Sequence, residues 1–94
     1  MSKSILSNEK RCWVCGKISN IEKHHIFGGG CRKLSEKYGI WIYLCHEHHN
    51  EPPDGAHHNA EIMERFRKMG QKAAMKKYNW NEEDFIKIFG RNYL

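Results

Sequence analysis

The sequence lacks any apolar run that approaches the roughly 18 residues of a membrane-spanning helix, and it carries no recognisable secretory signal peptide. It also contains no internal repeat and no low-complexity segment. We therefore expect a protein of the cytoplasm that has no membrane segment and keeps its thiols reduced.

Cysteine is scarce, and acidic residues are outnumbered by basic ones. Without an export signal, four cysteines favour a metal site, although a disulfide remains the alternative for a Cys-x-x-Cys pair. Lys and Arg number 16 against 11 Asp and Glu, which gives a formal net charge of +5 and a pI of about 9.1. This balance suits a polyanionic partner such as DNA.

The chain is also short. Its 94 residues allow one domain at most, and in a domain of this size buried area only narrowly offsets chain entropy. A bound metal is therefore an expected part of the fold. We expect a monomer in which residues 12–57 form a zinc knuckle and core, residues 59–94 form a helical C-terminal part, and residues 1–10 are loosely ordered.

One metal site can be assigned from spacing. Cys12 and Cys15 form a Cys-x-x-Cys pair, and Cys45 and His48 repeat the two-residue gap. Together they supply the four ligands of a tetrahedral structural zinc and leave no open position. Gly16 follows the second thiolate, where such a turn needs a positive φ.

Other imidazoles remain beside this complete set. They are His24, His25, His49 and His57. Three further residues could bind metal but are assigned to neither group: Cys31, His46 and His58. A lone cysteine is more commonly a small buried thiol, and a lone histidine is more commonly an exposed imidazole.

The N-terminal half predicts two strands around a glycine loop. Residues 20–27 read as a strand on which His24 and His25 point to opposite sides. Residues 28–30 are glycines without the Lys-Ser/Thr of a nucleotide-binding loop. A helix over 32–38 should end at Gly39, and residues 40–44 should form a buried strand.

The C-terminal half predicts two helices. A turn at 52–55 precedes a helix over 59–78, whose buried face we assign to Ile62, Phe66, Met69 and Ala73. Another face carries Arg65, Lys68, Lys72 and Lys76, which either form a solvated surface or follow a DNA backbone. A second helix should start at Asn81 with Asp84, bury Phe85, Ile86 and Phe89, and stop at Gly90, with the tail packing on the core.

These motifs resemble an HNH nuclease with the ββα-metal fold, and in particular small phage proteins similar to the recombination enhancement, RecA-dependent nucleases. The likeness rests on residues 24–29, 32–33, 35–39, 44–45, 48–49, 55, 57 and 89–94. It implies an α+β fold in which two short strands and a helix surround the zinc knuckle, with additional C-terminal helices.

The resemblance implies roles for the surplus histidines. His25 would be the general base that activates water, and His24, His49 and His57 would hold a catalytic divalent cation, whether Mg2+, Mn2+, Ni2+ or Zn2+. Ile40 occupies the position at which the family has an Asn. In the family this Asn helps to hold the loop that orients the general base. The partners implied are DNA and a RecA filament, in a host cytoplasm.

Hydrolysis of a phosphodiester fits these residues, because it needs a base that works near neutral pH and a cation to stabilise the leaving oxygen. Arg32 could clamp the scissile phosphate, or it could be a surface charge. Two other classes of function compete with the nuclease: a non-catalytic zinc-finger module that binds nucleic acid, and a structural interaction protein. Neither needs four imidazoles beside a filled zinc site.

Overall fold

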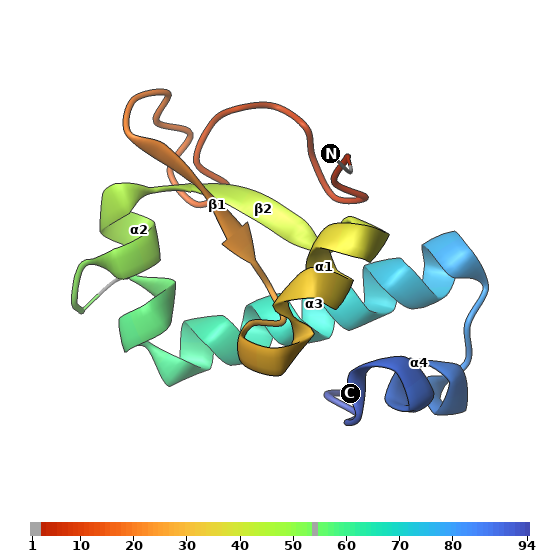
Figure 1. Cartoon of the computed structure of the whole chain (residues 1–94). Helices are drawn as coiled ribbons and strands as arrows, with labels where there is room; N and C mark the ends of the chain where they lie inside the picture. The colour runs from red at the N-terminus through yellow and green to blue at the C-terminus, as the bar shows by residue number, and fades with distance from the viewer. Residues whose placement is uncertain (1–2, 54) are drawn as a thin grey trace.

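The computed structural model describes residues 3–53 and 55–94, which form an α+β fold with a two-stranded antiparallel sheet (Figure 1). The elements in chain order are β1 (Ile21–His25), η1 (Gly29–Cys31), α1 (Arg32–Tyr38), β2 (Trp41–Cys45), α2 (His46–Asn50), η2 (Ala56–His58), α3 (Ala60–Tyr78) and α4 (Glu82–Phe89). Asp54, expected in the turn before the long helix, lies outside the described residues. None of these helices combines the length and apolarity needed to cross a membrane.

The sheet pairs β1 with β2 so that Ile21 lies opposite Cys45 and His25 lies opposite Trp41. The apolar β2 is buried at four of its five positions. Figure 1 shows α3 running beneath the strands, with α2 near one end of the molecule and α4 near the other. β1 contacts α2, and its His24 ring lies 5.9 Å from the Phe66 ring on α3, centroid to centroid.

Gly70 allows α3 to approach the sheet closely. A Cβ atom at this position would lie 2.9 Å from the Ile40 side chain and 3.1 Å from that of Ile26. The buried face of α3 follows this contact, since Ala74 is fully buried and Ala73 is only partly buried. Our assignment of Ala73 to the core was wrong by one position, because the helix is turned to bring Gly70 against the sheet.

The N-terminal segment is attached to the sheet. The Ser4 hydroxyl donates to the Trp41 carbonyl oxygen at 2.6 Å, and the Ile5 amide donates to the Gly39 carbonyl oxygen at 2.9 Å. Ser4 is buried, and Ile5 packs on the core. The expectation of loose order over residues 1–10 was therefore wrong for this segment; residues 1 and 2 lie outside the described part.

α1 has the predicted bounds and ends at Gly39, which adopts a left-handed conformation with φ of 71°. The helix also holds the loop that follows β1. The buried Ser35 hydroxyl donates to the Phe27 carbonyl oxygen at 2.8 Å and accepts from the Phe27 amide at 3.0 Å. This pair of bonds fixes the backbone two residues after His25.

α4 begins with the predicted capping box, in which the side chains of Asn81 and Asp84 exchange hydrogen bonds with each other's backbone, and it stops at Gly90. Phe85 and Phe89 are buried as expected. Ile86 is 39% exposed, so its assignment to the apolar side was wrong. On a short helix the step from Phe85 to Phe89 already sets the buried direction, and Ile86 lies about 100° away from Phe85.

The C-terminal tail packs back on α3, as predicted. The fully buried Gln71 donates from Nε2 to Asn92 Oδ1 at 2.7 Å, and its Oε1 accepts from the Tyr93 amide at 2.8 Å. The Tyr93 ring then lies 5.1 Å from the Phe27 ring, centroid to centroid. The tail, α3 and the loop after β1 therefore meet at one place.

Candidate metal centre and active site

The structure brings the seven residues expected to bind metal into two separate clusters. One holds Cys12, Cys15, Cys45 and His48, and the other holds His24, His49 and His57. Within each cluster the potential ligand atoms lie within 4.8 Å of one another. Each cluster could hold one metal ion.

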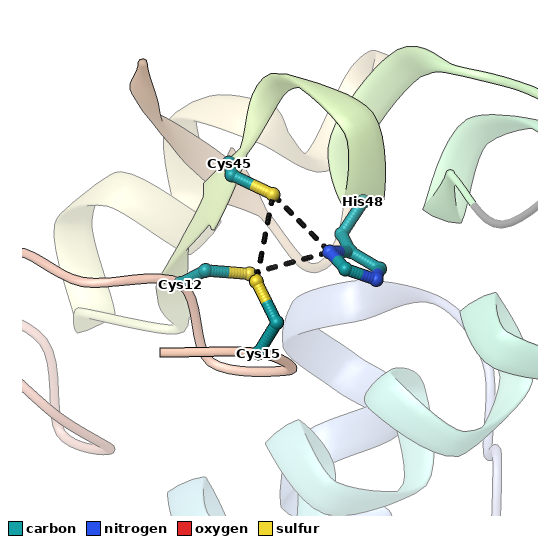
Figure 2. A group of neighbouring side chains, drawn as sticks. All are labelled: Cys12, Cys15, Cys45 and His48. Atoms are coloured by element: carbon teal, nitrogen blue, oxygen red, sulfur yellow. Dashed lines mark hydrogen bonds between the residues drawn. The ribbon is translucent and has the colours of Figure 1, made fainter. Parts of the chain in front are cut away.

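The cysteine cluster joins three segments of the chain. Figure 2 shows its four side chains pointing at one another from the N-terminal loop, the end of β2 and α2. Sγ of Cys12 lies 3.7 Å from Nδ1 of His48, and Sγ of Cys15 lies 3.9 Å from Sγ of Cys45. Ligand atoms around a tetrahedral zinc are about 3.5 to 3.8 Å apart. These two separations are close to that range, and Sγ of Cys45 lies nearer, 3.1 Å from Nδ1 of His48.

The electrostatics of this cluster also suit a cation. Burial raises the pKa of the Cys12 thiol, but hydrogen bonds from the backbone of Cys45, Cys15 and Val14 outweigh it and lower the pKa to about 6. The pKa of Cys45 is raised, first by burial and also by the neighbouring sulfurs. Three adjacent thiolates repel one another, and a bound cation removes that repulsion.

The histidine cluster is assembled from β1, α2 and η2. Nε2 of His49 lies 3.0 Å from Nε2 of His57, and the His24 ring lies 5.1 Å and 5.2 Å from these two rings, centroid to centroid. Both ring nitrogens of His24 are buried, and neither has a hydrogen-bond partner among the described residues. A buried polar atom without a partner is costly, and a metal bond would satisfy one of the two.

His24 is held in the form that binds metal. Burial, followed by the charges of His49 and His57, lowers the pKa of its imidazole to about 3. The ring therefore stays neutral at physiological pH and keeps a lone pair available. Neutral imidazole is the ligand form for divalent cations.

Glu22 fixes the orientation of the His49 ring through a hydrogen bond to its Nδ1 atom. Its Oε1 accepts from Nδ1 of His49 at 2.8 Å and from the Asn50 side-chain amide at 3.1 Å. Because Nδ1 then carries the proton, Nε2 of His49 turns its lone pair toward His24 and His57. The hydrogen bond from His49, followed by that from His46, lowers the pKa of Glu22 and keeps this carboxylate ionised.

Sequence reasoning missed Glu22. It lies two residues before His24, and the period of two along a strand puts both side chains on the same face of β1. That spacing was the available signal that Glu22 lies near the site, but it does not indicate which residue Glu22 contacts. The contact with His49 depends on where α2 packs, and this is a long-range feature.

His25 points to the other side of β1 from His24, as predicted. Its Nε2 lies 3.0 Å from Oε1 of Glu36 on α1, and Nζ of Lys23 lies 3.0 Å from the same oxygen. Only 12% of the His25 side chain is exposed. A carboxylate on Nε2 leaves Nδ1 as the nitrogen able to take a proton.

Two cavities of about 370 Å³ and 260 Å³ lie beside the histidines. They share His25, Gly28, Gly29 and His57 on their walls. The smaller one is also lined by Lys23, His49 and Arg32, so Arg32 lies beside the histidine cluster. The larger one contains Arg67, which sequence reasoning did not select.

The remaining candidates lie apart from both clusters. Arg65, Lys68, Lys72 and Lys76 are all exposed on α3, and Arg65 approaches Glu61 at 3.9 Å. The residues left out of the ligand sets, Cys31, His46 and His58, belong to neither cluster. Their exposure makes the four basic residues accessible to a nucleic-acid backbone.

Comparison with known proteins gives no match for this chain: no protein-family model, no curated protein and no solved structure. The candidate site therefore rests on the side-chain geometry described above. The likeness to HNH nucleases stays a hypothesis from sequence motifs.

Proposed function

We propose that the protein is a metal-dependent DNA endonuclease of the HNH type, linked to phage recombination, that hydrolyses phosphodiester bonds. The observation that carries this proposal is the second cluster. Three imidazoles converge beside a complete Cys3His set, and the next residue along β1, His25, lines both cavities at the same place. A zinc-finger binding module has no use for this second arrangement.

The two clusters have different tasks in this proposal. Cys12, Cys15, Cys45 and His48 hold a structural zinc. His24, His49 and His57 hold the catalytic cation, and imidazole ligands suit zinc, nickel or manganese better than magnesium. When bound, this cation stabilises negative charge on the phosphate and on the leaving oxygen. His24 stays neutral, and Glu22 keeps His49 in the tautomer that binds.

His25 supplies the base. Its Nε2 faces Glu36, so Nδ1 takes the proton from the attacking water in the cavity. Arg32, on the wall of the same cavity, offers a planar guanidinium to the phosphate oxygens. The basic residues Arg65, Lys68, Lys72 and Lys76 add attraction for the DNA backbone.

Adjacent residues of α1 take over the task of the Asn that the HNH pattern has at Ile40. Ile40 is fully buried and packs toward Gly70, so its side chain holds no loop by hydrogen bonding. Ser35 fixes the backbone of Phe27 instead. Glu36 bonds the ring of His25 directly.

Substitution of Glu36 tests this positioning role. We expect Glu36→Ala to lower kcat for DNA cleavage by about 10- to 100-fold with little change in KM, because the base loses its orientation while the substrate contacts remain. Glu36→Gln keeps an acceptor for Nε2 and should recover part of kcat. Steady-state cleavage kinetics measure both constants.

Glu83→Ala is the matched control, since Glu83 is exposed in the first turn of α4. It should cleave like the wild type. Equal losses of kcat in Glu36→Ala and Glu36→Gln, accompanied by a lower melting temperature in both, would assign Glu36 to stability alone.

A plasmid-cleavage assay tests the function itself. Purified protein should convert supercoiled DNA to nicked or linear forms when Mn2+, Ni2+, Zn2+ or Mg2+ is added, and not without added cation. Parallel reactions with RecA and an oligonucleotide show whether cleavage needs a recombinase filament. Absence of cleavage under all these conditions, with DNA binding retained, would favour the zinc-finger binding module.

A further inference from the structure

The larger cavity lies where the C-terminal tail, α3 and the glycine loop meet. It is lined by His25 and His57 together with Arg67, Met63 and Tyr93. Its volume of about 370 Å³ falls in the range of small-molecule pockets, about 300 to 1,000 Å³. We refer to it as the Arg67 pocket.

Arg67 brings an unneutralised charge to this pocket. Its Nε atom is buried and has no hydrogen-bond partner, and no Asp or Glu within residues 3–53 and 55–94 makes an ion pair with it. The guanidinium carbon lies 5.6 Å from the centre of the Tyr93 ring. A partly buried guanidinium without an acid is a costly arrangement, and an anion with planar, bidentate acceptors, such as a phosphate, relieves it.

The pocket also has apolar and aromatic side chains beside its two histidines. Phe27, Met63 and Tyr93 contribute to its walls. Phosphate alone gains nothing from such a surface, whereas a nucleobase does, because bases pack against aromatic side chains with little dependence on sequence. The combination of one guanidinium with apolar walls suits a whole nucleotide.

We infer that the Arg67 pocket receives one unpaired nucleotide of the DNA strand, next to the phosphodiester that is cleaved. This inference rests on the proposed nuclease function and specifies its substrate class. A base in a duplex is stacked and paired, so it can enter a side pocket only if that pairing is absent or is broken at a cost of a few kcal/mol. The protein therefore acts on single-stranded DNA, or on unpaired positions within a duplex.

The glycine loop leaves the entrance to this pocket open. Gly28 lines both cavities and has φ of −91°, a value that any residue adopts. A Cβ atom added there would have no heavy atom within 4 Å. The fold therefore does not require glycine at this position, and a methyl group would take up space beside the two cavities. Gly30 has the same open surroundings but lines neither cavity.

The test is DNA binding without added divalent cation, so that it does not depend on cleavage. Fluorescence anisotropy compares a labelled 12-nucleotide single strand with the same strand paired to its complement, at one fixed salt concentration. We expect the single strand to bind about tenfold more tightly than the duplex. Arg67→Gln should weaken single-strand binding by about 10- to 100-fold, the usual effect of losing a charged hydrogen bond.

Matched controls separate the pocket from general charge and from folding. Lys77→Gln removes a charge from an exposed position on the same helix and should change single-strand affinity less than twofold. Gly28→Ala should weaken it by roughly tenfold, because the methyl group would take up space needed by the bound nucleotide, and Gly30→Ala should leave it unchanged. Circular dichroism melting should show Gly28→Ala folded like the wild type.

Duplex binding as tight as single-strand binding, or wild-type affinity in both Arg67→Gln and Gly28→Ala, would overturn the inference. If the wild type still cuts plasmid DNA in that case, the proposed nuclease stands and only the pocket assignment fails. Pocket-dependent binding by a protein that cuts no DNA would support the pocket and overturn the nuclease.

Discussion

His25→Ala should lower DNA cleavage by about two to four orders of magnitude, the usual contribution of a positioned general base. The same variant should keep its metal content and melting temperature, and its DNA affinity should stay nearly intact, because Arg67 rather than His25 supplies the charged contact in the pocket. His25 belongs to neither metal cluster, and its ring leaves β1 on the side opposite His24. Cleavage rates under single-turnover conditions measure this loss without a contribution from product release.

His49→Ala is the informative comparison. It removes a ring that converges on His24 and His57, so the catalytic cation should bind more weakly, and part of the lost activity should return at higher divalent concentration. The defect of His25→Ala should not respond to added cation. Wild-type cleavage by His25→Ala would show that the base has been assigned wrongly.

Loss of the structural zinc should unfold the protein. Cys45 is fully buried at the end of β2, and its cluster joins the N-terminal loop to the sheet and α2. Structural zinc contributes about 10 to 16 kcal/mol of apparent binding free energy in small domains, which exceeds or equals the typical total stability of about 5 to 15 kcal/mol. We therefore expect Cys45→Ser to be unfolded at room temperature by circular dichroism.

Cys31→Ser provides the control, because Cys31 lies outside both clusters and its Sγ donates to the Phe89 carbonyl oxygen at 3.6 Å. It should retain about one tightly held zinc per chain in metal analysis, as should the wild type. A strong chelator should unfold both proteins. A stably folded wild-type preparation that contains no zinc would refute the structural site.

Local signals in the sequence were sufficient for most helix ends. Gly39 and Gly90 stop α1 and α4 in left-handed conformations, and Asn81 with Asp84 starts α4 through its own side chain. Such caps involve residues close in the chain, so their geometry can be predicted from spacing. The set of Cys12, Cys15, Cys45 and His48 was also accessible, because Cys and His at short, repeated gaps indicate a shared metal. The set of His24, His49 and His57 was implied only by the resemblance to HNH nucleases.

The residues that support the site could not be predicted in this way. Glu22, Glu36 and Arg67 are ordinary charged residues in the sequence, and each gains its role from a segment 11 to 42 positions away. Glycine is unfavourable inside a helix, yet Gly70 allows α3 to lie against Ile40 and so sets the rotation of the helix. These features depend on which faces pack together, and periodicity alone does not determine that.

His48 and His49 are consecutive residues of α2, a helix of only five residues, and one belongs to the cysteine cluster while the other belongs to the histidine cluster. A helix this short has no stability of its own, so its position depends on its attachments. On our proposal the two metals are therefore acquired in a fixed order: zinc during folding, and the exchangeable cation afterwards. A cell could then hold a folded, inactive reserve of the nuclease and release its activity through the supply of the second ion alone.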